Sequence, residues 1–171
     1  NYYSRKGKTQ QFLKKKTGFI LYSAVRERID IEVDKPIEHK PSNSLFPLAI
    51  FDNTRGYLVD FAKEASCCYD YGLFTSCLFM LRKITETLII ELYESKSIQA
   101  KIKNTKGDYL QLSDLIAAVA NEPTWKLTKI VKENLPKIKL LADSSVHSKR
   151  FSAKQPDIDG LKTNVRIAFE E

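Results

Sequence analysis

The residues best suited to do chemistry lie late in the chain, at the end of a helical pattern. Asp143 precedes His147 by four positions, which places both side chains on one face of a helix. A carboxylate there can orient the imidazole, and an oriented histidine can act as a general acid or base. Lys149 and Arg150 follow, so the same face can bind a phosphate. The alternative is a histidine that is hydrogen-bonded for structural reasons.

Arg82 is a second candidate, because it lies on an otherwise apolar helical segment. Glu86 follows it by four positions, a spacing that allows an ion pair within one helix. An arginine among apolar residues must emerge at an edge or be paired. Two alternatives remain open: Arg82 bridges to Glu86 or to a neighbouring helix, or it points into a groove shared with the helix that ends at His147.

Other common kinds of site have no pattern in this sequence. There is no Gly-rich phosphate loop, and the glycines are scattered. Only two histidines, His39 and His147, accompany three cysteines, so a zinc cluster is not expected. The serines beside His147 are its neighbours along a helix and do not point at it. We expect no metal, no cofactor and no serine hydrolase.

The net charge of +7 is concentrated at the N-terminus. The first sixteen residues hold six basic side chains and no acid: Arg5, Lys6, Lys8, Lys14, Lys15 and Lys16. With aromatic residues among them, such a segment can lie along the phosphates of RNA or DNA and stack on bases. A solvated linker from an upstream domain is the alternative. We expect residues 1–41 to form a basic extension and a proline-containing linker, and residues 42–171 to form the folded domain, with the boundary near residues 42–46.

The elements that must position these residues are organised around Leu58 to Glu94. Apolar residues recur there at intervals of three or four, which predicts two amphipathic helices joined at Gly72. Asp52 or Asn53 is a plausible N-cap for the first helix. The second helix is apolar over more than one face, so it should lie in the middle of a bundle.

Shorter helical patterns follow a loop that has a turn at Lys106-Gly107. Ser113 should cap one helix, which ends before Pro123. A short helix with Trp125 comes next, and Pro136 fits the first turn of another helix that reaches His147. A last helix should start at Asp157. The sequence therefore predicts an all-α bundle of five to six helices around a long central hairpin.

The cysteines and the hydropathy indicate a cellular location. Cys67, Cys68 and Cys77 lie at helix-core spacings, and an odd number of clustered thiols favours free, buried cysteines in a reducing compartment. No apolar run is long enough for a transmembrane helix, and the first residues do not form a secretory signal. We expect a cytoplasmic protein without a membrane partner, and we expect the chain to be part of a longer one.

Two stretches of the sequence resemble a known family. The first is Tyr69-Asp70-Tyr71-Gly72-Leu73, followed by Met80-Leu81-Arg82-Lys83 and Glu86. The second is Ala142-Asp143-Ser144-Ser145-Val146-His147, followed by a closing helix. Together they resemble a bacterial family of HEPN-like helical domains, long catalogued as a domain of unknown function. The resemblance covers about residues 45–171.

This resemblance implies a HEPN-like bundle that dimerises. Many members of the wider superfamily are ribonucleases that use an arginine, four to six intervening residues and a histidine at the dimer cleft. His147 matches that histidine, whereas Ala142, Leu141 and Leu140 occupy the positions of the arginine. Lys139 lies one residue further away, so the ribonuclease motif is not intact.

We therefore expect a non-catalytic, dimerising HEPN-like module. It would serve as an accessory or sensing domain, linked to nucleic acid, and its partner would be a protein or an upstream domain of a larger bacterial protein. One alternative is a metal-independent ribonuclease, in which His147 acts at a dimer cleft and Arg82 or Arg150 supplies the missing charge. The other is a nucleic-acid-binding module that uses the basic N-terminus.

Overall fold

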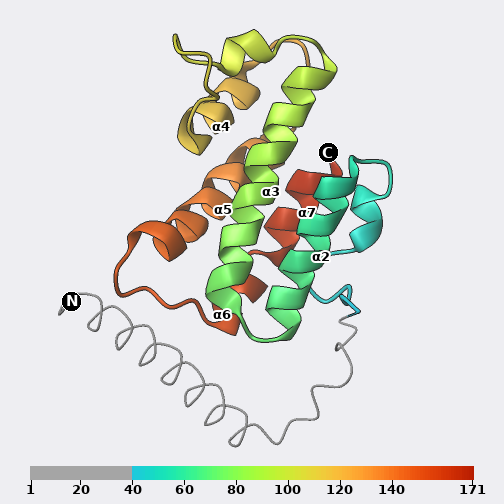
Figure 1. The fold of residues 1–171 in the computed structure, drawn as a ribbon, viewed down its shortest axis with the longest axis vertical. Helices are drawn as coiled ribbons and strands as arrows, with labels where there is room; N and C mark the ends of the chain where they lie inside the picture. Colours follow the sequence, from blue (N-terminus) through green and yellow to red (C-terminus); the bar gives the residue numbers. More distant parts are fainter. Residues whose placement is uncertain (1–39) are drawn as a thin grey trace, which may run out of the picture. The chain divides into compact units, whose positions relative to one another are not determined.

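A computed structural model describes residues 40–171, which belong to one compact unit beginning at residue 39. Within residues 40–171 the secondary structure is helical, apart from one isolated antiparallel bridge between Lys103 and Tyr109 (Figure 1). The elements are η1 (Leu48–Phe51), α2 (Gly56–Asp70), α3 (Phe74–Ser95), η2 (Gln99–Ile102), α4 (Leu112–Asn121), α5 (Lys129–His147), α6 (Gln155–Asp159) and α7 (Lys162–Glu170). This confirms the predicted all-α bundle.

Helices α2 and α3 form the predicted hairpin, and Gly72 makes the turn between them. Gly72 has a φ of 71°, a left-handed conformation that suits a residue without a side chain. The amide of Leu73 then reaches back to the carbonyl of Cys68 at 2.8 Å, which closes the end of α2. The start of α2 differs from the prediction. Arg55 is the N-cap residue, and its side chain makes no capping bond. The predicted caps, Asp52 and Asn53, lie in the turn after η1.

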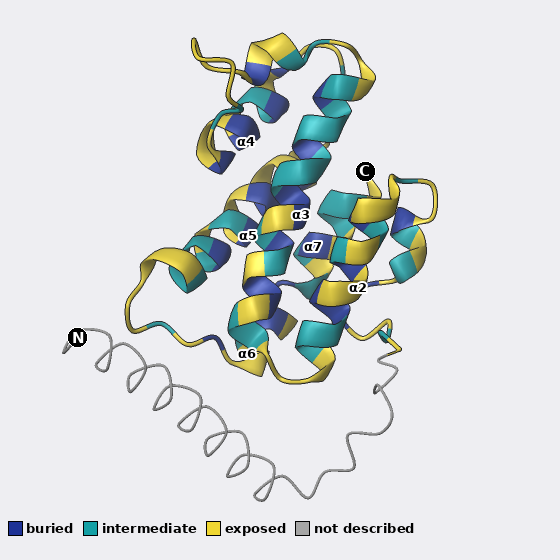
Figure 2. Ribbon diagram, in the orientation of Figure 1, coloured by how far each residue is buried: buried dark blue, intermediate teal, exposed yellow. Residues whose placement is uncertain are grey.

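Helix α3 runs through the middle of the described unit, as its apolar residues predict. It packs against α2 and α5 above all, and also against η2, α4, α6 and α7. Figure 2 shows buried residues along most of its length. They are Cys77, Leu78, Leu81, Ile84, Thr85, Ile89 and Tyr93. The rest of the unit therefore covers α3.

The apolar core consists of two clusters, one along each half of α3. The first cluster includes buried residues of α2, the first half of α3, α6 and α7. Phe46, Phe51 and Phe169 meet within it, with ring centroids 5.6 to 6.0 Å apart. Leu45 and Phe46, which lie at the domain boundary that the sequence predicts, are both buried.

The second cluster surrounds the last turns of α3. It includes buried residues of η2, α4 and the first half of α5. Tyr93 and Trp125 are in edge-to-face contact there, with ring centroids 4.9 Å apart. Helix α4 begins at Leu112 with Gln111 at its N-cap, so Ser113 is inside its first turn and is not the cap.

Helix α5 corrects the prediction of a break before Pro136. Residues 129–147 form one continuous helix with Pro136 inside it. A proline there removes one backbone hydrogen bond and crowds the carbonyl of Lys132. Both residues are exposed, so water can bond that carbonyl. Four buried apolar residues hold the helix together on either side: Val131, Leu135, Ile138 and Ala142.

The end of the chain forms two helices where the sequence predicted one. Helix α6 ends at Asp159 and α7 begins at Lys162. Asp157 is inside α6, where its carboxylate accepts a bond from the amide of Lys154 at 2.8 Å. After α7, the Glu171 carboxylate accepts bonds from the amide and the hydroxyl of Thr128, both at 2.6 Å. The end of α7 is thereby attached to the start of α5.

The three cysteines differ in burial. Cys77 is buried, and burial raises the pKa of its thiol to about 12. Cys67 and Cys68 are only partly buried, so the prediction of buried thiols is correct for Cys77 alone. All three are free. Across residues 40–171 no helix combines the length and the apolar character needed to cross a membrane.

The proline inside α5 gives a first prediction. Pro136→Ala should restore a backbone hydrogen bond and relieve crowding, a gain of up to about 3 kcal/mol that the freer unfolded chain reduces by about 1. We expect the free energy of unfolding in urea to rise by about 1–2 kcal/mol. The adjacent exposed change Lys137→Ala should alter it by less than about 0.5 kcal/mol. A destabilised Pro136→Ala variant would show that the proline is required.

Glu122, just after α4, gives a prediction about pH. Bonds from the Thr124 hydroxyl and from Lys101 lower the pKa of its carboxyl below the ordinary 4.5, so the folded state favours the charged form. That stabilisation is complete above pH 4.5 and is lost as the pH falls through the lowered pKa. The difference in unfolding free energy between wild type and Glu122→Gln should therefore shrink on acidification. A difference that does not change with pH would contradict this.

Candidate functional site

Arg82 and Asp143 form an ion pair between α3 and α5. The Arg82 guanidinium donates to one oxygen of the Asp143 carboxylate, and the Lys139 ammonium donates to the other. The three side chains are between 17% and 26% exposed. Among the described residues, the partner of Arg82 is thus on a neighbouring helix, and Glu86 takes no part in this ionic cluster.

The carboxylate of the ionic cluster is shared by its two cations. Both carboxylate oxygens of Asp143 accept bonds from cations, so among residues 40–171 its hydrogen bonds do not go to the imidazole of His147. Arg82 and Lys139 each neutralise part of one carboxylate, which weakens their pull on a phosphate. The cluster therefore holds α3 against α5.

His147 is exposed at the last residue of α5. Lys149 and Arg150 are exposed in the connection to α6. These three residues are therefore exposed at and just after the end of α5, and Arg82 bonds Asp143 one turn before His147. The six basic residues predicted to bind nucleic acid, Arg5 to Lys16, lie outside the described residues, and that prediction stays a prediction.

A feature that the sequence did not single out is the outer hairpin face. We use this name for the surface formed by Glu64, Cys67, Cys68, Ser76, Phe79 and Met80 on α2 and α3. These residues line a hollow of about 460 Å³. Phe79 at its side is 53% exposed, and Leu73 in the nearby turn is 55% exposed. Phe79 is one more apolar residue in a segment that was predicted to be apolar over more than one face. The sequence therefore did not mark it as exposed.

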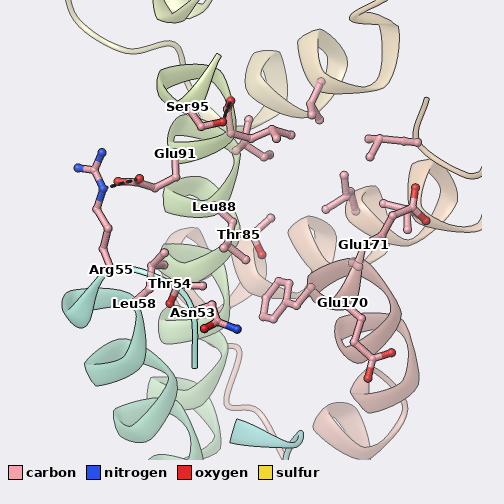
Figure 3. Close-up of a pocket in the computed structure, with 18 residues that line it drawn as sticks. Asn53, Thr54, Arg55, Leu58, Thr85, Leu88, Glu91, Ser95, Glu170 and Glu171 are labelled. Atoms are coloured by element: carbon pink, nitrogen blue, oxygen red, sulfur yellow. Dashed lines mark hydrogen bonds and ion pairs between the residues drawn. The ribbon is translucent and has the colours of Figure 1, made fainter. Parts of the chain in front are cut away.

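A second hollow is a cavity of about 420 Å³ on a different side of α3. Figure 3 shows its walls: Thr85, Leu88, Glu91 and Ser95 from α3, residues 53–55 with Leu58 at the start of α2, and Glu170 and Glu171 at the end of α7. Residues of α5 complete it. The lining comes from distant parts of the chain, so no sequence motif marks the cavity.

The cavity has a buried apolar floor and an exposed polar rim. Leu58, Val131 and Leu135 are buried, whereas Arg55, Glu170 and Glu171 are exposed and Glu91 is half-buried. Such a distribution is typical of a site for a small organic molecule. The described residues include no group of three or more histidine, cysteine or acidic side chains that could hold a metal ion.

The pair between α3 and α5 can be measured directly. We expect a double-mutant cycle with Arg82→Ala and Asp143→Ala to give a coupling energy of about 1–2 kcal/mol, because both groups are mostly buried. The pair Lys129 and Glu133 is the control, because both side chains are exposed at 89% and 55%. Its coupling should be about 0.5 kcal/mol or less. Equal coupling in the two cycles would show that Arg82 and Asp143 do not join the helices.

Comparisons of this chain with models of protein families, with curated proteins and with solved structures yield no match.

Proposed function

We propose that this protein is a non-catalytic helical accessory module that forms a homodimer through the outer hairpin face. The observation that carries the proposal is the exposed ring of Phe79 next to a hollow on the same surface. Single exposed apolar side chains are common on monomers, but an exposed ring beside a mostly apolar hollow makes a larger patch, and such patches mark interaction sites. The HEPN-like resemblance supports the same state of assembly, because it implies dimers.

The geometry suits a second copy of this chain. A twofold axis brings the same patch of both subunits together, so a projection and a hollow on one patch can fill each other. In the dimer, each Phe79 would enter the hollow lined by Cys67, Cys68 and Met80 of the other subunit. Burial raises the pKa of the Cys67 and Cys68 thiols, with a contribution from nearby carboxylates, so both remain neutral and behave as small apolar groups.

The bonds of Asp143 and the position of His147 weaken the ribonuclease alternative. Asp143 binds Arg82 and Lys139, so Arg82 offers His147 no unpaired charge, and Arg150 is left as the exposed arginine near it. The histidine itself is at an exposed helix end, away from an enclosed site that would exclude water. A module whose cations are used to join its own helices is better suited to assembly than to RNA cleavage.

Analytical ultracentrifugation tests the proposal. We expect wild-type protein to sediment as a dimer at tens of micromolar, and Phe79→Asp to sediment as a monomer, because a charge would be buried in the interface. The control is Leu140→Asp, at an apolar position of α5 that is 72% exposed. Leu140→Asp should remain dimeric. Circular dichroism should show that both variants keep the helical content of the wild type.

Two outcomes would contradict this proposal. If the wild-type protein is monomeric throughout this concentration range, it does not form the proposed dimer. A Phe79→Asp variant that dimerises as strongly as the wild type would place the interface elsewhere. Cleavage of RNA by the same wild-type preparation, lost in His147→Ala, would instead favour the ribonuclease alternative.

A further inference from the structure

We infer that the cavity between α3, α5, α7 and the start of α2 binds a small apolar molecule that carries an ammonium group. The inference goes beyond the proposed dimer, because the cavity and the outer hairpin face share no lining residue.

The size and the floor of the cavity set the apolar part of the ligand. A volume of about 420 Å³ lies within the range of small-molecule sites, roughly 300–1,000 Å³. The floor includes side chains from α2, α3, α5 and α7, among them Leu58, Leu88, Val131 and Phe169. An alkyl or aryl body placed there would lose contact with water and gain contact with four helices.

The rim sets the polar part. Three carboxylates line the cavity, Glu91, Glu170 and Glu171, against one guanidinium, that of Arg55. Arg55 already bonds Glu91, with its Nε at 2.9 Å from the carboxylate, and Glu94 is 3.7 Å away. Arg55 is therefore paired with carboxylates, and the net negative charge of the rim favours binding of a cation.

Hydrogen-bonding capacity points the same way. Deep in the cavity, the hydroxyl of Thr85 donates to the carbonyl of Leu81 at 2.8 Å, so its oxygen can still accept a bond. The hydroxyl of Ser95 likewise donates to the carbonyl of Leu92. Glu171 keeps its two bonds from Thr128, which leaves Glu170 as the rim carboxylate for which the described residues show neither an ion pair nor a side-chain hydrogen bond. The cavity mainly offers acceptors, and an ammonium group supplies donors only.

Calorimetry with three probes of one shape separates charge from shape. The probes are 4-phenylbutylamine, 4-phenylbutanol and 4-phenylbutyrate. We expect the amine to bind with a Kd of about 0.1–1 mM, in keeping with a ligand of this size. The alcohol should bind about tenfold more weakly, and the carboxylate should bind more weakly than the alcohol.

Variants locate the binding. Glu170→Gln, at an exposed position, should reduce the preference for the amine over the alcohol to about twofold or less. Ala168→Leu should fill part of the cavity and weaken amine and alcohol alike. The matched control is Glu86→Gln, which removes a carboxylate of α3 outside the cavity lining. Glu86→Gln should bind all three probes as the wild type does, and thermal unfolding should show that each variant is folded.

Three results would overturn the inference. They are the absence of amine binding at millimolar concentration, equal affinity for the three probes, and amine binding or preference that survives both Ala168→Leu and Glu170→Gln unchanged. The sedimentation of the Phe79→Asp variant is independent of all three results. Failure of the dimer and failure of the ligand site are therefore distinguishable.

Discussion

A helix that is apolar around most of its circumference has to be covered, and this requirement governs the whole described unit. Helix α3 buries seven side chains, and its neighbours take their places around it. Helix α2 covers one side through the turn at Gly72. Helix α5 covers another and is held there by the pair between Arg82 and Asp143. The later helices and η2 cover what remains, so each candidate site lies on the outer surface of this arrangement or at a gap in it.

The charged residues of the centre take part in this packing. Arg82 emerges from an apolar helix, and a charge in that position is costly unless it is paired. Asp143 supplies the pair, and Lys139 completes it one turn earlier on α5. Two of the residues that the sequence suggested for a site, Arg82 and Asp143, are therefore the ones that join two helices. The exposed ring of Phe79 and the cavity are left as the features that packing alone does not explain.

The parts of the fold that could be predicted are those that depend on local sequence. The hairpin follows from the spacing of apolar residues and from one glycine, both visible within about forty positions. Pro136 misled the prediction because α5 continues through burial of Val131, Leu135 and Ile138, and burial is a tertiary effect that outweighs a helix-breaking residue. The role of Phe46 is likewise a tertiary matter, since only its contact with Phe51 and Phe169 shows that it belongs to the core.

The candidate sites depend even more on distant contacts. Arg82 and Asp143 are 61 positions apart, so the sequence could suggest a neighbouring helix as partner without showing which residue it is. The cavity draws on α2, α3, α5 and α7, and its lining residues look like ordinary core positions in each. Only the exposure of His147 at a helix end could have been anticipated, because Ser148 and the residues after it are polar.

The division of the core into two clusters has a mechanical consequence. Leu58 belongs to the first cluster, Ile89 and Val131 belong to the second, and Ala168 packs against both. All four line the cavity, so the cavity lies at the boundary between the two clusters, and α3 runs through both. Helices α3 and α5 contribute buried residues to both clusters, so the two clusters meet along these helices and at the cavity. A molecule bound in the cavity would contact residues of both clusters and would fix their orientation relative to each other.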